Sequence, residues 1–127
     1  MPKIAITTKD APAPVASYSQ AVRKGDILQV AGQGGTDPAT GDYAGATVAE
    51  QTAQTLRNIQ AILRAAGGDF DDVMMMRVYL TDVEHFAEMN SVYSTFVGEP
   101  FPARTTVYVG LPEGMLVEID ALAVLGD

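Results

Sequence analysis

Cysteine is absent from this sequence of 127 residues, and histidine occurs once, as His85. The absence of cysteine excludes disulfide bonds, thiolate nucleophiles and cysteine-ligated zinc sites. A single histidine leaves little material for a histidine-rich metal site. No apolar run approaches the roughly 18 residues that a membrane-spanning helix needs, and the first residues lack the apolar core of a signal peptide. We therefore expect no membrane partner and a cytoplasmic location.

Positive charge is scarce as well, with 8 Lys and Arg against 16 Asp and Glu and a formal net charge of −8. An acidic surface repels phosphate backbones, so we expect no nucleic-acid partner. An anionic small molecule can bind only where a local cation overrides the net charge. Each of the few arginines is therefore a candidate for such a site.

The length of the chain and its 47% hydrophobic content are typical of one globular unit, so we expect a single domain over residues 1–127. Helical spacing predicts helices over 47–66 and 83–97, and each begins at a capping-box pattern, Thr47/Glu50 and Thr81/Glu84. Their apolar faces are Val48, Leu56, Ile59, Leu63 and Ala66 in the first and Phe86, Met89, Tyr93 and Phe96 in the second. Strands are expected over 4–7, 20–23, 27–31, 73–80, 104–109 and 115–124. This order predicts an α+β fold, a mixed sheet of about six strands with two helices on one face.

Alternation along the strands predicts what each face of the sheet carries. In the last strand Ile119, Ala121 and Ala123 share a face that suits packing against helices, and Glu118 and Asp120 lie on the other. This second face also carries apolar residues, which we expect to be Val73, Met75, Leu122 and Val124. Two helices cannot cover both faces, so we expect other copies of the chain to bury the second one.

Several segments, taken together and in order, resemble the RidA (YjgF) family. They are Ala16-Ser17-Tyr18-Ser19-Gln20-Ala21, Ala31-Gly32-Gln33, Asp37-Pro38-Ala39-Thr40-Gly41, 51–59, 65–67, 78–82, Met89-Asn90, Phe101-Pro102-Ala103-Arg104-Thr105, 111–114 and Val117-Glu118-Ile119. The resemblance implies a homotrimer of chorismate-mutase-like subunits with ligand clefts between subunits. It also implies hydrolysis of reactive 2-enamines and 2-imines, such as 2-aminoacrylate and 2-iminopropionate, to 2-keto acids and ammonia.

The resemblance assigns the catalytic roles to Arg104 and Glu118. In deaminase members an arginine in the position of Arg104 holds the substrate carboxylate, which a guanidinium can do through two parallel hydrogen bonds. A glutamate in the position of Glu118 orients the attacking water, and partial burial makes a carboxylate a better base. The substrate-binding residues that the resemblance and this chemistry suggest are Tyr18, Gly32, Asn90 and Thr106. The imine is already electrophilic, so neither a metal nor an organic cofactor is expected.

The chain differs from many members at the cleft. Ala31 stands where many have serine, Thr106 where many have cysteine, and Gly34-Gly35 where many have Ile-Pro. Two alternatives stay open. One is a non-catalytic trimer that binds small carboxylates. The other is the ribonuclease or translation-inhibitor activity ascribed to some relatives, which the acidic net charge of the chain disfavours. Each catalytic residue also has a purely structural interpretation. Arg104 could form an ion pair at a subunit interface, and Glu118 could be a solvated strand residue.

Overall fold

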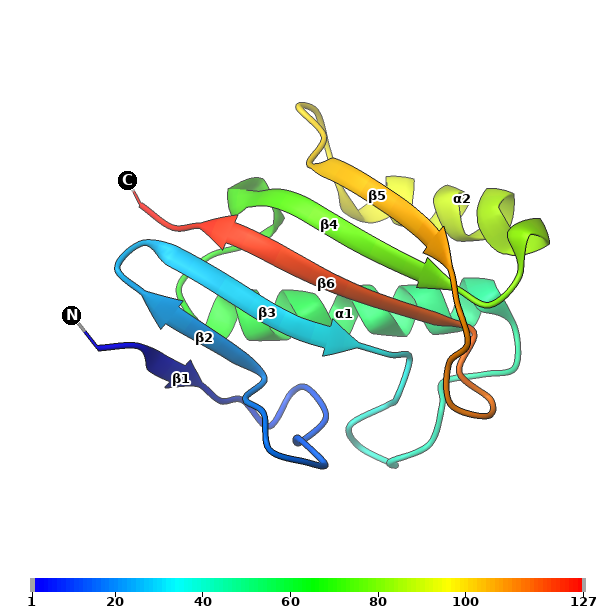
Figure 1. The fold of residues 1–127 in the computed structure, drawn as a ribbon, viewed down its shortest axis with the longest axis horizontal. Coiled ribbons are helices and arrows are strands. Elements are labelled where there is room, and N and C mark those ends of the chain that lie inside the picture. Colours follow the sequence, from blue (N-terminus) through cyan, green and yellow to red (C-terminus); the bar gives the residue numbers. More distant parts are fainter. Residues whose placement is uncertain (1, 127) are drawn as a thin grey trace.

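A curved sheet of six strands forms the frame of the protein in the computed structural model, which describes residues 2–126 (Figure 1). The strands are β1 (Ile4–Ile6), β2 (Ala21–Lys24), β3 (Ile27–Gln33), β4 (Val73–Leu80), β5 (Ala103–Tyr108) and β6 (Val117–Val124). Their order across the sheet is β1-β2-β3-β6-β4-β5. β4 and β5 are parallel and the other neighbours are antiparallel, which confirms the predicted mixed sheet.

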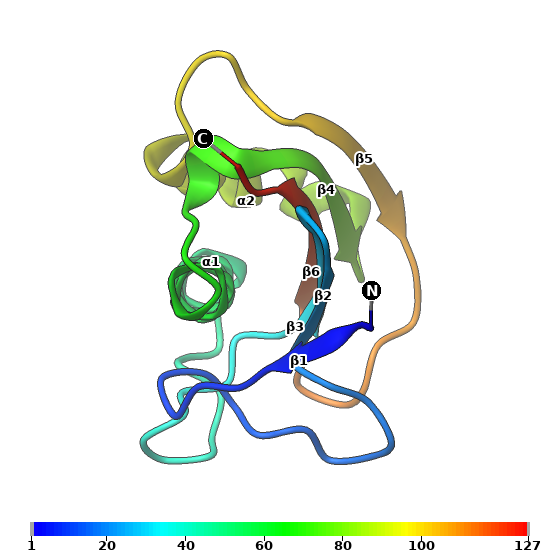
Figure 2. The ribbon, with the colours of Figure 1, turned by 90° about the vertical axis from the view of Figure 1, so that its left-hand side faces the viewer.

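Helices α1 (Val48–Ala65) and α2 (Phe86–Phe96) both cover the same face of the sheet, and the other face is bare within the subunit (Figure 2). The predicted capping box at the start of α1 is present, because Thr47 accepts from the Glu50 backbone and the Glu50 side chain accepts from that of Thr47. No helix in the described part of the chain has the length and apolar character to cross a membrane.

The start predicted for the second helix is wrong in detail. A 3₁₀ turn, η2 (Val83–His85), precedes α2, and its N-cap is Asp82 rather than Thr81. The Asp82 carboxylate accepts from the backbone N–H of Glu84 at 2.8 Å. A short carboxylate reaches an amide two residues ahead, which is the geometry of a tight turn and not of a capping box.

The hydrophobic core lies between the two helices and the face of the sheet that they cover. The predicted stripe of α1 is buried along its whole length, with Leu56, Ile59 and Leu63 at 0% exposure. From the sheet, Ile119 and Ala121 of β6 are also fully buried. Burying a side chain such as Leu or Ile contributes roughly 1.5–3 kcal/mol, so this layer is the main source of stability.

The bare face carries the alternate residues of β4 and β6, among them Glu118 and Asp120, as predicted. Val73, however, does not belong to it. A β-bulge between Val73 and Met75 shifts the register, so that Val73 pairs with Ala123 and is buried on the helix side. One extra residue in a strand reverses the face of everything before it, and strict alternation therefore misplaced Val73.

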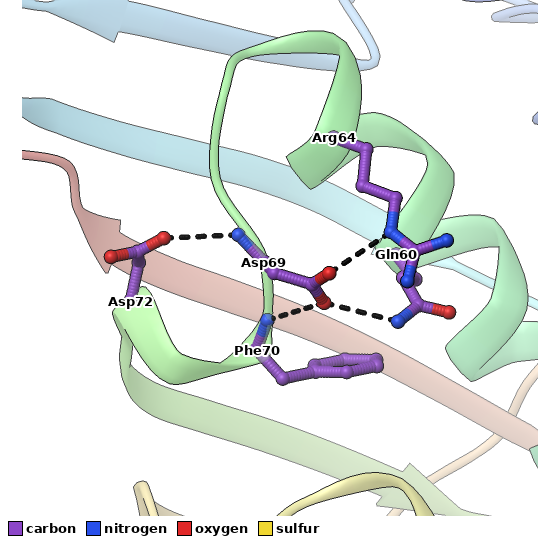
Figure 3. A network of polar contacts seen from close by, with 5 residues as sticks. All are labelled: Gln60, Arg64, Asp69, Phe70 and Asp72. Carbon is purple, nitrogen blue, oxygen red and sulfur yellow. Dashed lines mark hydrogen bonds and ion pairs between the residues drawn. The ribbon is translucent and has the colours of Figure 1, made fainter.

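A polar network at the end of α1 connects this helix to the start of β4 (Figure 3). Asp69 accepts hydrogen bonds from Gln60 Nε2 at 3.0 Å, from Arg64 Nε at 2.9 Å and from the Phe70 backbone N–H at 2.8 Å. The Asp72 carboxylate accepts in return from the Asp69 backbone N–H. Burial raises the pKa of Asp69, but the hydrogen bonds and the charge of Arg64 together outweigh it and lower the pKa.

Candidate functional site

Arg104 of β5 is held on the helix side of the sheet by residues of α2. Its Nη1 donates to Oδ1 of Asn90 at 2.7 Å. The guanidinium carbon lies 4.7 Å from the ring centroid of Tyr93 and 5.4 Å from that of Phe86. Both distances suit cation–π attraction, so two aromatic rings and one amide orient the cation.

A hollow of about 340 Å³ opens beside this guanidinium. Its lining residues are Asn90, Tyr93, Ser94, Val97, Phe101, Pro102 and Arg104. A guanidinium has five N–H donors in a planar fork, and Asn90 accepts from one nitrogen. The remaining donors leave Arg104 able to bind a carboxylate through two parallel bonds.

Tyr93 has a further property in this hollow. Its hydroxyl is buried and has no hydrogen-bond partner among residues 2–126. Burial raises the pKa of Tyr93, and the positive charge of Arg104 opposes that increase. The hydroxyl therefore stays neutral at ordinary pH, and its ring remains a stable platform for the arginine.

Glu118 of β6 lies in a second hollow, of about 280 Å³, on the bare face of the sheet. Tyr18, Ala31 and Gly32 line this hollow with it. A Cβ atom placed on Gly32 would lie 2.4 Å from Oε2 of Glu118, so the carboxylate occupies the space that a side chain at this position would take. Burial first, and the charge of Asp120 second, raise the pKa of Glu118.

Local features of β3 expose backbone at this second hollow. The strand extends to Gln33, two residues beyond the predicted end, so Gly32 lies inside it. Its pairing with β6 shifts between Val30 and Gln33, and Gly32 is left out of the regular register. Such an irregularity leaves backbone groups without partners in the ladder, and Gly32 is exposed at this hollow. Tyr18, which is 48% exposed, comes from the loop before β2.

The two hollows lie on opposite faces of the same sheet. Arg104 pairs with Met76, which pairs with Ala121, and these two residues are buried under the helices. Glu118 pairs with Tyr79 on the other face. The structure thus brings Arg104 together with Asn90, and Glu118 together with Gly32 and Tyr18, but it does not bring the two groups together within one subunit.

Thr106, also predicted for the site, lies two residues after Arg104 on the same face of β5, and lines neither hollow. The contacts of Phe86 and Tyr93 with Arg104 were not predicted, because both rings suit the apolar face of the helix. A signal was present, because Phe86, Asn90 and Tyr93 recur at helical spacing and share that face. Among residues 2–126, no three histidine or acidic side chains gather as the ligands of a metal ion would.

The whole fold is similar to known proteins. The family model described as Endoribonuclease L-PSP matches residues 8–125, a range that includes every residue of both hollows. A RutC family protein of Pyrococcus horikoshii is 47% identical over 95% of this chain and 97% of that protein. A protein of Bos taurus named 2-iminobutanoate/2-iminopropanoate deaminase is 44% identical over 95% of this chain and 89% of its own. The crystal structure of RidA from Psychrobacter has a TM-score of 0.92 at 41% identity and covers 96% of this chain and 99% of that one.

Proposed function

Because this chain belongs to the RidA (YjgF) family, we propose that it is a deaminase that hydrolyses reactive 2-imine and 2-enamine acids in clefts between the subunits of a homotrimer. The observation that carries the proposal is the separation of Arg104 and Glu118 onto opposite faces of one sheet. An arginine that grips a carboxylate and a glutamate that activates water must act on neighbouring atoms. Two copies of the chain can supply such a pair where one copy cannot.

The Arg104 hollow is suited to the acid end of the substrate. Asn90, Tyr93 and Phe86 hold the guanidinium in one orientation before any ligand arrives. A preorganised cation loses less freedom on binding than a mobile one, so more of the interaction energy appears as affinity. This fixed cation also offsets, locally, the net charge of −8 that would otherwise repel an anion.

The Glu118 hollow is suited to the reacting carbon. With its raised pKa, the Glu118 carboxylate binds a proton more readily than an ordinary glutamate, which favours proton transfer from water. The water oxygen bonds to the imine carbon while its proton passes to Glu118. Glu118 then passes this proton to the nitrogen, which also takes the proton of the new hydroxyl group. The C–N bond breaks as the carbonyl of the 2-keto acid forms, and ammonia leaves.

Backbone and hydroxyl groups complete the proposed cleft. Gly32, outside the regular register of β3, offers backbone groups to the substrate nitrogen, and Tyr18 borders the same hollow. Thr106 is assigned here only through its place on β5 beside Arg104. No step needs a metal or an organic cofactor. A cytoplasmic location stays a prediction.

A test of this proposal couples the protein to an L-amino-acid oxidase, which releases 2-imino acids. We expect the purified trimer to accelerate keto-acid and ammonia formation beyond the spontaneous rate, and Arg104→Ala to abolish the acceleration. Multi-angle light scattering gives the oligomeric state of both proteins. Binding of pyruvate without any acceleration would instead support a non-catalytic trimer that binds small carboxylates, for which the Arg104 hollow alone suffices.

A further inference from the structure

A hydrogen-bonded cluster lies beside Glu118 on the bare face of the sheet, and the proposed reaction does not use it. Asp120 accepts from Nε of Arg77 at 2.8 Å and from the hydroxyl of Tyr79 at 3.0 Å. The Asp120 side chain is only 13% exposed, whereas that of Arg77 is 52% exposed. Two donors from β4 therefore hold a largely buried carboxylate in one position.

The sheet register places this cluster directly against Glu118. Glu118 and Asp120 are separated by one residue on β6, so their side chains leave the same face. On β4, Tyr79 pairs with Glu118 and Arg77 pairs with Asp120. Although Tyr79 lies directly across from Glu118, its single hydroxyl proton is donated to Asp120.

We infer that Asp120, fixed by Arg77 and Tyr79, is a positioning residue that sets the charge around Glu118 and leaves the Glu118 carboxylate free to take the proton of water. This inference rests on the proposed function, in which Glu118 is the base. Hydrogen bonds donated to Glu118 and a negative charge beside it would change its basicity in opposite directions. Asp120 takes the hydrogen bonds that would make Glu118 a weaker base, and its own negative charge makes Glu118 a stronger one.

The described groups that border Glu118 come from β3, β4, β6 and the loop before β2, and the sign of each charge effect follows from them. Gly32 of β3 has no side chain, and Tyr18 comes from the loop before β2. From the strands, Tyr79, Arg77 and Asp120 face the same side. Removing the negative charge of Asp120 should lower the pKa of Glu118. Removing the positive charge of Arg77 should raise it, because the repulsion from Asp120 is then less compensated.

The test is a carbon-13 NMR titration of the Glu118 side-chain carboxyl in the intact protein, with the signal assigned by its loss in Glu118→Gln. We expect the titration midpoint to move to lower pH in Asp120→Asn and to higher pH in Arg77→Gln. The acid limb of kcat/KM for imine hydrolysis should move in the same two directions. Asp26→Asn is the matched control, because Asp26 lies in the β2–β3 turn beside the far end of β6 and its loss should leave the midpoint unchanged.

Opposite shifts in the two variants separate a charge effect from general damage, which would not reverse its sign. An unchanged midpoint, or a shift in the same direction in both, overturns the inference. Should Asp120→Asn fail to fold, the direction of the shift in Arg77→Gln decides alone. The titration needs no turnover, so an inactive wild-type protein would refute the proposed function while the titration still tests the role of Asp120.

Discussion

Arg104 and Glu118 leave opposite faces of one sheet, Arg104 toward α2 and Glu118 toward the face that no helix covers. Their separation follows from the alternation of side chains between the two faces along each strand. Arg104 is in register with Met76 and Ala121, and Glu118 is an odd number of residues away from Ala121 on β6. Within one subunit the sheet lies between the two groups, and in the proposed homotrimer a second subunit completes the pair.

Mixing two inactive variants tests this relationship directly. In the proposed homotrimer each cleft takes Arg104 from one subunit and Glu118 from its neighbour. When Arg104→Ala and Glu118→Gln are unfolded and refolded together in equal amounts, about a quarter of the clefts should contain both native residues. We expect about a quarter of the wild-type activity from a mixture of two inactive proteins. Continued inactivity of a trimeric mixture would mean that the reaction does not need groups from two chains.

Gly32→Ala should separate activity from stability. The added methyl group would lie 2.4 Å from Oε2 of Glu118, and the tip of that flexible side chain can move aside. We expect nearly unchanged thermal unfolding but a fall in kcat/KM of about 10- to 100-fold, because a base displaced by about 1 Å no longer meets the water. Gly126→Ala is the control, since its new atom would meet Asp26 Oδ2 at 3.9 Å, an ordinary contact. Equal effects of the two substitutions would contradict the assigned role of Gly32.

The raised pKa of Glu118 predicts a pH-dependent stability. Between the ordinary glutamate pKa of about 4.3 and the higher value in the folded state, the folded chain binds more protons than the unfolded one. This contribution to stability is therefore fully present below the unfolded pKa and is lost as pH rises through the folded pKa. Glu118→Gln should unfold at higher temperature than wild type at pH 7, and the difference should shrink toward pH 4. Calorimetry at several pH values measures it, and a difference that grows on acidification would have the wrong sign.

Gln51 of α1 should be essential to the loop that leads into β6. Its buried amide donates to the carbonyls of Gly45 and Gly114, and its Oε1 accepts from the Leu116 backbone N–H at 2.8 Å. Gln51→Leu leaves these groups unpaired, and we expect a loss of about 2–4 kcal/mol in the free energy of unfolding. Urea denaturation at a fixed protein concentration measures it. The control is Arg57→Leu, at an exposed position of the same helix, which should cost less than 1 kcal/mol.

Local patterns in the sequence determined the elements of this protein. The stripe from Val48 to Ala66 and the capping box at Thr47 predicted α1, and alternation predicted that Glu118 and Ile119 face opposite ways, because both patterns depend on the geometry of a single element. The similarity of its segments to one family also pointed to Arg104.

The tertiary structure alone decided how elements distant in sequence are matched. It moved Val73 to the core through a bulge, placed Asn90 against Arg104, joined Arg77 and Tyr79 to Asp120, and put Arg104 and Glu118 on opposite faces. Strand register and helix packing are long-range properties, and no window of sequence contains them.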